Sequence, residues 1–153
     1  MLSLAGSYNM SNKFKIGVIG LGKMGISHCS ILGAHPDIDK IYVCDSSKFL
    51  LTAFKKHSKF KTFTDYKTMI SSNDLDFVIV ATPSKFHFEM VKFALNNECH
   101  VFCEKPFILN MNEGIELAQI ANNNRLVNQV GFHNRFIGTF RLAKRLINQN
   151  KSV

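Results

Sequence analysis

Three glycines that directly follow a short apolar run constrain the fold of this chain more than any other feature. Residues 15–25 read KIGVIGLGKMG, so Gly20, Gly22 and Gly25 form the pattern G-x-G-x-x-G. After a strand, the first glycine permits a tight turn, the second lets a ligand approach the backbone, and the third lets the next helix pack closely. The free N–H groups and the dipole at the start of that helix attract phosphate. The pattern therefore predicts binding of a dinucleotide through its pyrophosphate.

Segments typical of strands and of helices alternate along the rest of the chain. We expect strands at 14–20, 40–45, 59–63, 74–82, 100–104 and 126–133, and helices at 23–35, 47–57, 65–71, 84–97, 110–124 and 136–150. The segment 74–82 (DLDFVIVAT) is apolar on both faces, as central parallel strands are. This order predicts an α/β fold with a doubly wound parallel sheet of about six strands, Rossmann-like, in three αβα layers.

An acidic residue ends the second expected strand. Asp45 follows Gly25 by twenty residues, and a carboxylate at this place can accept hydrogen bonds from both hydroxyls of an adenosine ribose. It also repels a 2′-phosphate, so it favours NAD over NADP. Ser46, Ser47 and Lys48 come next and leave NADP possible. Two roles for Asp45 stay open, because it could instead only cap the helix that follows.

Length and composition agree with one globular domain. The chain has 153 residues, of which 46% are hydrophobic, enough to form a core. Its longest apolar runs, such as 77–81, fall far short of the ~20 residues of a membrane span, so we expect no membrane partner. The net charge of +8 comes from 19 basic and 11 acidic residues. Because the basic residues are spread along the chain, we expect no nucleic-acid partner.

The last expected helix is amphipathic. Arg141, Lys144 and Arg145 share one face, and the other face carries apolar side chains that suggest its buried side. Those apolar residues are Phe140, Leu142, Leu146 and Ile147. The basic face is expected to be solvated, with the attraction of anionic ligands as the alternative role.

The four cysteines indicate a reduced, cytoplasmic protein. Cys44 and Cys99 lie in or beside apolar runs, as buried thiols do, and the chain has no C-x-x-C pair. Cys99 and Cys103 flank a strand whose side chains alternate between two faces, so we expect no metal site. Residues 1–12 are expected to form a flexible leader without the features of a signal peptide. Residues 13–153 then form the dinucleotide-binding domain.

Three motifs, the glycine motif among them, resemble those of the Gfo/Idh/MocA oxidoreductase family. These are GVIGLGKMG (17–25), ATPSKFH (81–87) and CEKPF (103–107), with GFHNRF (131–136) as a looser fourth. The resemblance spans about residues 13–150. It implies a dehydrogenase that transfers hydride between a nicotinamide cofactor and a hydroxyl of a sugar, cyclitol or nucleotide sugar. The Glu-Lys-Pro block argues against another Rossmann enzyme, such as a dihydrodipicolinate reductase-like protein.

The resemblance also implies roles for individual residues. His87 would lie near the cofactor, although a packing or capping role is its alternative. Lys105 would lie beside the nicotinamide and the substrate, where a cation lowers the pKa of the reacting hydroxyl, and we assign it as the catalytic residue. Arg135 would contact cofactor or substrate, or form a structural ion pair. The expected cofactor-binding residues are Gly20, Leu21, Gly22, Lys23, Met24, Gly25, Asp45, Ser46, Ala81, Thr82, Pro83, His87, Glu104, Lys105 and Arg135.

Enzymes of this family carry a second domain that binds the substrate, supplies the main acid/base pair and forms the oligomer interface. No segment of this sequence resembles it. We therefore expect the chain to bind NAD, with NADP possible, without completing catalysis. A homo-oligomer is expected only with that second domain. The alternative function is a non-catalytic module that senses dinucleotides.

Overall fold

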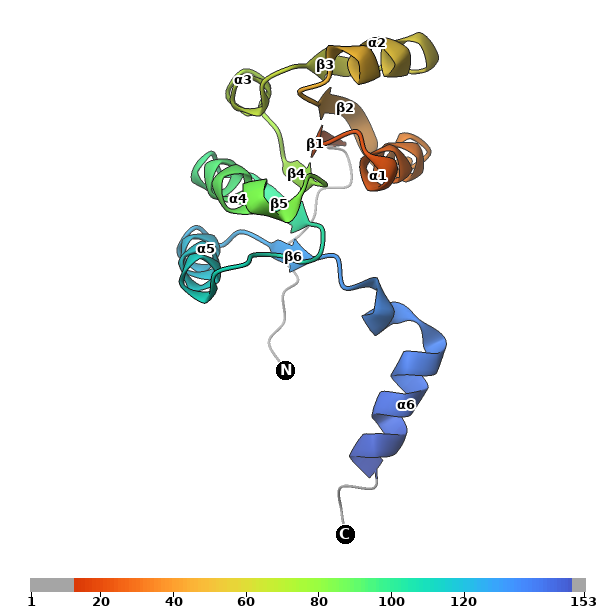
Figure 1. Cartoon of the computed structure of the whole chain (residues 1–153), viewed down its shortest axis with the longest axis vertical. Helices are drawn as coiled ribbons and strands as arrows, with labels where there is room; N and C mark the ends of the chain where they lie inside the picture. Colours follow the sequence, from red (N-terminus) through yellow and green to blue (C-terminus); the bar gives the residue numbers. More distant parts are fainter. Residues whose placement is uncertain (1–12, 150–153) are drawn as a thin grey trace.

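The computed structural model describes residues 13–149, which form a parallel sheet with helices on both sides (Figure 1). The strands are β1 (Phe14–Ile19), β2 (Ile38–Cys44), β3 (Lys61–Phe63), β4 (Phe77–Val80), β5 (His100–Cys103) and β6 (Asn128–Val130). The helices are α1 (Lys23–Gly33), α2 (Lys48–His57), α3 (Tyr66–Ser71), α4 (His87–Asn96), α5 (Met111–Asn123) and α6 (Gly138–Gln149). The expected leader, residues 1–12, lies outside the described residues.

The six strands lie in the order β3-β2-β1-β4-β5-β6, and all neighbouring pairs are parallel. The chain starts in the middle of the sheet, builds outward to β3 and then crosses to the other side of β1. Between β1 and β4 the strand order reverses, and ligands of such sheets bind outside the carboxyl ends of the strands at this point. The predicted doubly wound, Rossmann-like sheet is confirmed.

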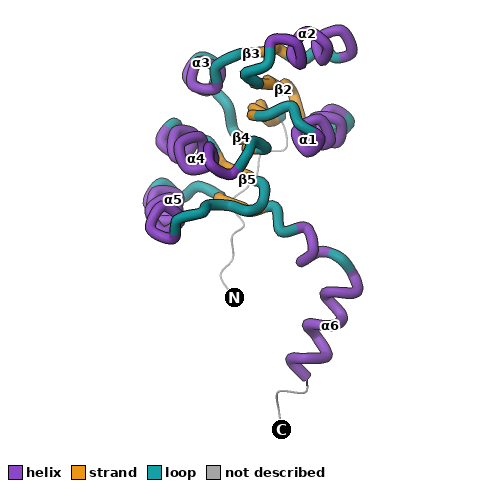
Figure 2. The backbone as a smooth tube through the Cα atoms, viewed as in Figure 1, coloured by secondary structure: helices purple, strands orange, loops and turns teal. Residues whose placement is uncertain are grey.

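Two apolar cores cover the two faces of the sheet. On one face α3, α4 and α5 bury side chains such as Met69, Val91 and Leu117. On the other face α1 and α2 contribute Cys29 and Leu51. Figure 2 shows this division, with helices on both sides of the strands. The alternation of strand and helix along the chain thus produces the three layers.

Side chains at the helix starts explain where several helices begin. The Asp65 carboxylate accepts from the backbone N–H and the hydroxyl of Thr68, each at 2.7 Å, and caps α3. Ser47 caps α2 and Asn110 caps α5 in the same manner. Helix α1 differs, because Gly22 stands at its N-cap and no side chain accepts from its first turn. The N–H groups at the start of α1 therefore remain available to a ligand.

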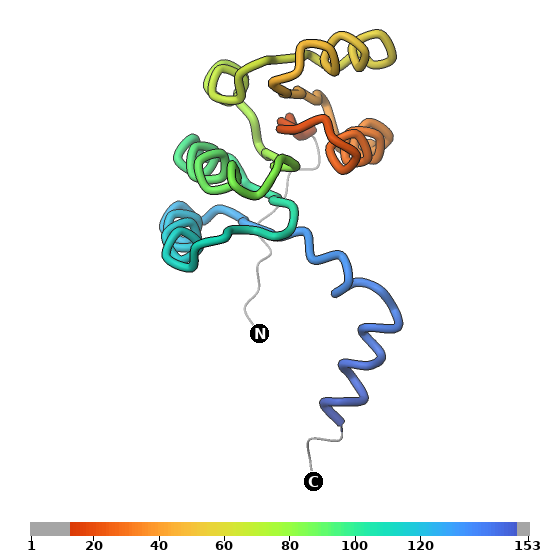
Figure 3. The backbone as a smooth tube through the Cα atoms, in the orientation of Figure 1, coloured from red at the N-terminus to blue at the C-terminus, as the bar shows by residue number. Residues whose placement is uncertain are grey.

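The carboxyl-terminal helix departs from the sequence-based prediction. The expected helix 136–150 is shorter in the structure, because a 3₁₀ turn, His133–Phe136, comes before it and α6 begins only at Gly138. Figures 1 and 3 show α6 extending away from the rest of the domain, and every described residue in it is exposed. The predicted buried side of this helix is therefore wrong for the chain described here. Its apolar residues, Phe140, Leu142, Leu146 and Ile147, are between 51% and 60% exposed.

Two smaller differences concern element boundaries. The expected helix 84–97 begins with a separate 3₁₀ turn, Ser84–Phe86, before α4. The expected strands 74–82 and 126–133 are shorter, because only Phe77–Val80 and Asn128–Val130 pair with neighbouring strands. The residues that follow β4 and β6 leave the ladder and form loops at the carboxyl edge, where the predicted site lies.

Candidate nucleotide-binding site

The predicted site residues lie mainly on three loops that follow adjacent strands. The loop after β1 holds the glycines, the loop after β4 holds residues 81–83, and the loop after β5 holds residues 104–106. Because β1, β4 and β5 are parallel neighbours, all three loops leave the sheet at the same edge. Three loops that are spread over about ninety residues of the sequence thereby lie close together in space.

Each glycine of the motif has a distinct structural reason. Gly20 has a φ of +97°, and a Cβ there would lie 2.7 Å from the carbonyl oxygen of Ala81. A Cβ on Gly25 would overlap the carbonyl oxygen of Gly20, so only glycine lets α1 pack this close to the loop. A Cβ on Gly22 would meet nothing within 4 Å. The fold itself therefore does not demand glycine at position 22, which fits a position kept open for a ligand.

Asp45 binds the backbone of the glycine loop. Its Oδ2 accepts from the N–H of Leu21 at 2.8 Å, and its Oδ1 accepts from the N–H of Ser47 at 2.8 Å. The carboxylate therefore connects the loop after β1 with the turn that begins α2. Each carboxylate oxygen can accept more than one hydrogen bond, so these contacts leave lone pairs for a ligand.

A cavity of about 460 Å³ adjoins Asp45. Seven of the predicted residues line it, namely Gly20, Gly22, Asp45, Ser46, Ala81, Thr82 and Pro83. The sequence analysis missed eight others: Ile19, Cys44, Leu50, Thr64, Asp65, Tyr66, Phe86 and Met90. Thr64 and its neighbours follow β3, so the rule that ligands bind at carboxyl ends could have identified them. A mostly apolar lining with a carboxylate at its edge suits a flat aromatic ring joined to a ribose.

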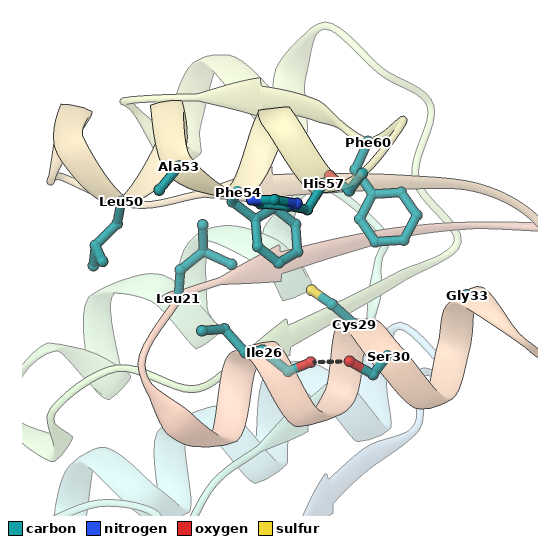
Figure 4. Close-up of a pocket in the computed structure, with 11 residues that line it drawn as sticks. Leu21, Ile26, Cys29, Ser30, Gly33, Leu50, Ala53, Phe54, His57 and Phe60 are labelled. Carbon is teal, nitrogen blue, oxygen red and sulfur yellow. Dashed lines mark hydrogen bonds between the residues drawn. The ribbon is translucent and has the colours of Figure 1, made fainter.

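A larger groove lies between α1 and α2, with a volume of about 530 Å³ (Figure 4). It is lined chiefly by apolar side chains, among them Phe54 and Phe60, and Leu21 is its only predicted site residue. The hydroxyl of Ser30 donates to the carbonyl oxygen of Ile26 within α1 at 2.9 Å. The groove thus offers few polar groups, and the cavity beside Asp45 is the better candidate for a nucleotide.

His87 is buried and joins two of the loops. Only 1% of the residue is exposed. Its Nε2 lies 2.8 Å from the carbonyl oxygen of Thr82, and its Nδ1 lies 2.9 Å from that of Phe107 and 3.1 Å from that of Pro106. All of these partners are acceptors, so the ring nitrogen that carries the proton donates to the carbonyl oxygen beside it. In the structure His87 holds the loops after β4 and β5 together and does not reach the surface.

Glu104 and Lys105 are adjacent but lie in different environments. Lys105 is exposed, whereas Glu104 is 8% exposed, and the Lys105–Pro106 peptide bond is cis. The Glu104 Oε1 lies 2.9 Å from Nε2 of His28, a residue of α1 that the sequence analysis missed. The Glu104 Oε2 accepts from the backbone N–H of Lys105 at 3.3 Å.

The remaining predicted residues are less tightly placed. Lys23, Met24 and Ser46 are exposed around the cavity and the start of α1. Arg135 is exposed on the 3₁₀ turn before α6. Within residues 13–149, no side-chain hydrogen bond or ion pair joins Arg135 to the other predicted site residues. The contact of Arg135 with cofactor or substrate stays a prediction.

All four cysteines are buried free thiols. Burial raises the pKa of Cys29, Cys44 and Cys103 to about 12 and that of Cys99 to about 11. The thiols therefore stay protonated near neutral pH and are poor metal ligands. In the described part of the chain, no three His, Cys, Asp or Glu side chains are placed to hold a metal ion.

Comparison with known proteins identifies the family. A family model described as "Oxidoreductase family, NAD-binding Rossmann fold" matches residues 14–132, which is most of the chain. The chain belongs to this Gfo/Idh/MocA family. Family membership confirms the predicted family and the predicted class of NAD-binding Rossmann domain.

Several characterised proteins are similar to this member of the family. D-glucoside 3-dehydrogenase of Escherichia coli is 29% identical over 141 residues, covering 90% of this chain and 40% of that protein. Myo-inositol 2-dehydrogenase of Thermotoga maritima is 29% identical over 134 residues, covering 87% and 40%. The chain thus spans about two fifths of the length of the curated relatives it matches.

The fold also matches solved structures. Scyllo-inositol dehydrogenase from Lactobacillus casei, solved with bound NAD(H) and scyllo-inositol, superimposes with a TM-score of 0.82 at 31% identity, covering 92% of this chain and 42% of that one. Among residues 13–149, no helix has the length and apolar character of a membrane span.

Proposed function

We propose that this chain is the NAD(H)-binding domain of a dehydrogenase acting on a hydroxyl of a sugar, cyclitol or nucleotide sugar. The observation that carries the proposal is the Asp45 carboxylate, which lies in the cavity wall and hydrogen-bonds the glycine loop. One group thereby joins the place for the adenosine ribose to the place for the pyrophosphate. The relatives named above, which act on inositols and glucosides, support the substrate class.

The chain's own residues suit each part of the cofactor. The cavity between the ends of β2 and β4 takes the adenine, and the start of α1 beside Gly22 takes the pyrophosphate. Asp45 accepts from the ribose hydroxyls and repels a 2′-phosphate, which favours NAD over NADP. Exposed Ser46 and Lys48 beside it leave some binding of NADP.

Lys105 is the residue that we assign to the chemical step. When bound, the cofactor supplies the hydride acceptor, and the alcohol carbon gives up its hydrogen with two electrons while its hydroxyl loses a proton. The Lys105 ammonium, exposed at the end of β5, stabilises the negative charge that develops on that oxygen. No residue of this chain is assigned as the group that removes the proton, so we expect the chain by itself to bind the cofactor without completing turnover.

A second candidate function is a dinucleotide sensor without catalysis. It is favoured by the exposed apolar side of α6, which resembles a surface for another protein. A sensor would bind NADH in the same cavity, and the binding of NADH would change its association with a partner protein. The two functions differ in whether any form of the protein oxidises an alcohol.

The experiment measures binding and turnover on the same preparation. The chain is titrated with NADH by calorimetry, and is then incubated with NAD⁺ and each of myo-inositol, scyllo-inositol, glucose and a uridine-diphosphate sugar while NADH formation is followed. We expect saturable binding of NADH and no turnover. Absence of binding by folded protein would contradict the proposal, and turnover would show that the chain holds its own acid/base group. The same assay on any longer form of this protein separates the dehydrogenase from the sensor.

A further inference from the structure

We propose that His28 is a positioning residue for Lys105 and that it acts through the carboxylate of Glu104. The proposal rests on the proposed function, in which Lys105 lies beside the nicotinamide. It connects a residue of the first helix, α1, with Glu104 and Lys105 at the end of β5. The argument depends on how the structure holds the Glu104 carboxylate.

Each oxygen of that carboxylate has a separate task. Oε1 lies 2.9 Å from Nε2 of His28, and the side chains are 18% exposed for His28 and 10% for Glu104. Oε2 accepts from the backbone N–H of Lys105 at 3.3 Å. The carboxylate therefore connects an imidazole on α1 with the backbone of Lys105. Because it is largely shielded from water, its orientation depends on these partners.

The packing around the pair leaves little room for another arrangement. The ring of Phe102 packs edge-on against the imidazole of His28, with 5.3 Å between the ring centroids. A Cβ on Gly131 would lie 3.3 Å from Oε2 of Glu104 and 3.0 Å from the ring of Phe102. Groups from α1, β5 and the loop after β6 thus surround one carboxylate. Such packing favours a single rotamer for Glu104.

The position of His28 on α1 gives the contact its consequence. The first turn of this helix, beginning at Lys23, holds the pyrophosphate in the proposed function, and His28 lies further along the same rigid helix. Through Glu104, the helix that holds the phosphates therefore also fixes the backbone that carries the Lys105 ammonium. Without His28, Oε1 would lose its partner and the Lys105 backbone would lose part of its support. Contacts with the nicotinamide end of the cofactor should then weaken, while contacts with the adenosine end should not.

The test compares NADH with ADP-ribose, which keeps the adenosine and the pyrophosphate and lacks the nicotinamide. Dissociation constants for both ligands are measured by calorimetry for the wild type and for His28→Ala, His28→Gln and Lys105→Met. We expect His28→Ala to weaken NADH binding about fivefold, the value of one hydrogen bond, and to leave ADP-ribose within about twofold. His28→Gln can still donate to Glu104 and should recover most of the loss. In a Lys105→Met background, His28→Ala should cost nothing further.

Two results would overturn the proposal. One is an equal loss for both ligands, which would indicate a general structural role for His28. The other is a loss of NADH affinity from His28→Ala that is as large in the Lys105→Met background as in the wild type. If the wild type binds neither NADH nor ADP-ribose, the proposed function itself is refuted. That result differs from both results that would overturn only the role of His28. If circular dichroism shows that His28→Ala does not fold, His28→Asn takes its place, since its amide is polar but too short to reach Glu104, and the same expectations apply.

Discussion

Asp45 accepts a hydrogen bond from the backbone N–H of Leu21, with 2.8 Å between Oδ2 and the nitrogen. The residue expected to select the ribose therefore also fixes the loop expected to bind the pyrophosphate. Its second oxygen accepts from Ser47 at the start of α2. A substitution at Asp45 thus changes both the selection of the ribose and the support of the glycine loop. Two different variants are needed to separate these effects.

Asp45→Asn and Asp45→Ala should differ in their effects on NADH. Asparagine keeps one oxygen that can accept from Leu21 but carries no charge, so we expect NADH binding to fall only about threefold while the preference over NADPH narrows. Alanine removes the loop contact as well and should weaken NADH at least about tenfold. Calorimetric titrations of both variants with both cofactors give the answer. Equal losses in the two variants would show that the Leu21 contact has no influence on binding.

Gly22→Ala and Gly25→Ala form a matched pair. A Cβ at position 22 meets nothing within 4 Å, so this variant should fold with nearly the wild-type melting temperature. Its methyl group points into the space expected for the pyrophosphate and should weaken NADH binding. A Cβ at position 25 overlaps the Gly20 carbonyl oxygen, so that variant should be strongly destabilised, by about 3 kcal/mol or more. Thermal denaturation followed by circular dichroism checks both; a Gly25→Ala protein as stable as the wild type would contradict the packing described.

Lys105→Met should change the balance between the two redox forms of the cofactor. The oxidised nicotinamide is positively charged and the reduced ring is neutral, so a nearby ammonium disfavours NAD⁺ relative to NADH. At a separation of about 4 Å in a water-like dielectric, the difference is about fivefold. Methionine removes the charge and keeps a side chain of similar length. The ratio of the affinity for NADH to that for NAD⁺ should therefore fall by about this factor. Exposed Lys144 on α6 provides the control, since Lys144→Met should leave the ratio unchanged.

The buried thiols predict a pH dependence of stability. Their pKa values lie near 11 to 12 in the folded chain and at an ordinary 9.0 when unfolded. Above pH 9.0 the unfolded chain therefore releases protons that the folded chain retains, and the free energy of unfolding should fall as pH rises from there toward 12. Below that range the thiols should have no effect. Urea denaturation across this range measures the decline for the wild type and for a Cys99→Ala variant, in which it should be smaller.

Reaction with a thiol reagent gives an independent check of the same burial. In the folded chain none of the four cysteines should react quickly, because each is buried and protonated. All four should react after denaturation. Since a ligand that binds only the folded state stabilises it, NADH should slow the reaction further. Rapid labelling of the folded protein would contradict the burial of these side chains.

Much of the fold followed from the sequence because local signals agreed with the topology. The glycine pattern, the alternation of segments and the double-sided apolar segment at β4 all favour one parallel sheet. The predicted placement of Asp45 at the end of a strand followed from the same rule. These features depend on neighbours close in sequence, where residue type and backbone conformation are directly linked.

Other features depend on contacts that sequence spacing does not reveal. His28 and Glu104 are 76 residues apart, and they meet only because α1 packs beside the end of β5. The amphipathic pattern of α6 correctly predicted a helix, but no described part of the chain covers its apolar side. Periodicity identifies a face that prefers burial and cannot identify what buries it. Similarly, Phe86 in the 3₁₀ turn before α4 and Met90 on α4 line the cavity, although neither lies at the carboxyl end of a strand.

The central claim is that NADH binds at the carboxyl edge of the sheet, in the cavity beside Asp45. Mapping backbone amide shifts by nuclear magnetic resonance while NADH is added tests it most directly. We predict the largest shifts at Leu21, Gly22, Ser46 and Thr82. Shifts confined to the groove between α1 and α2, at Phe54 and Phe60, or no shifts in a folded sample, would contradict the account.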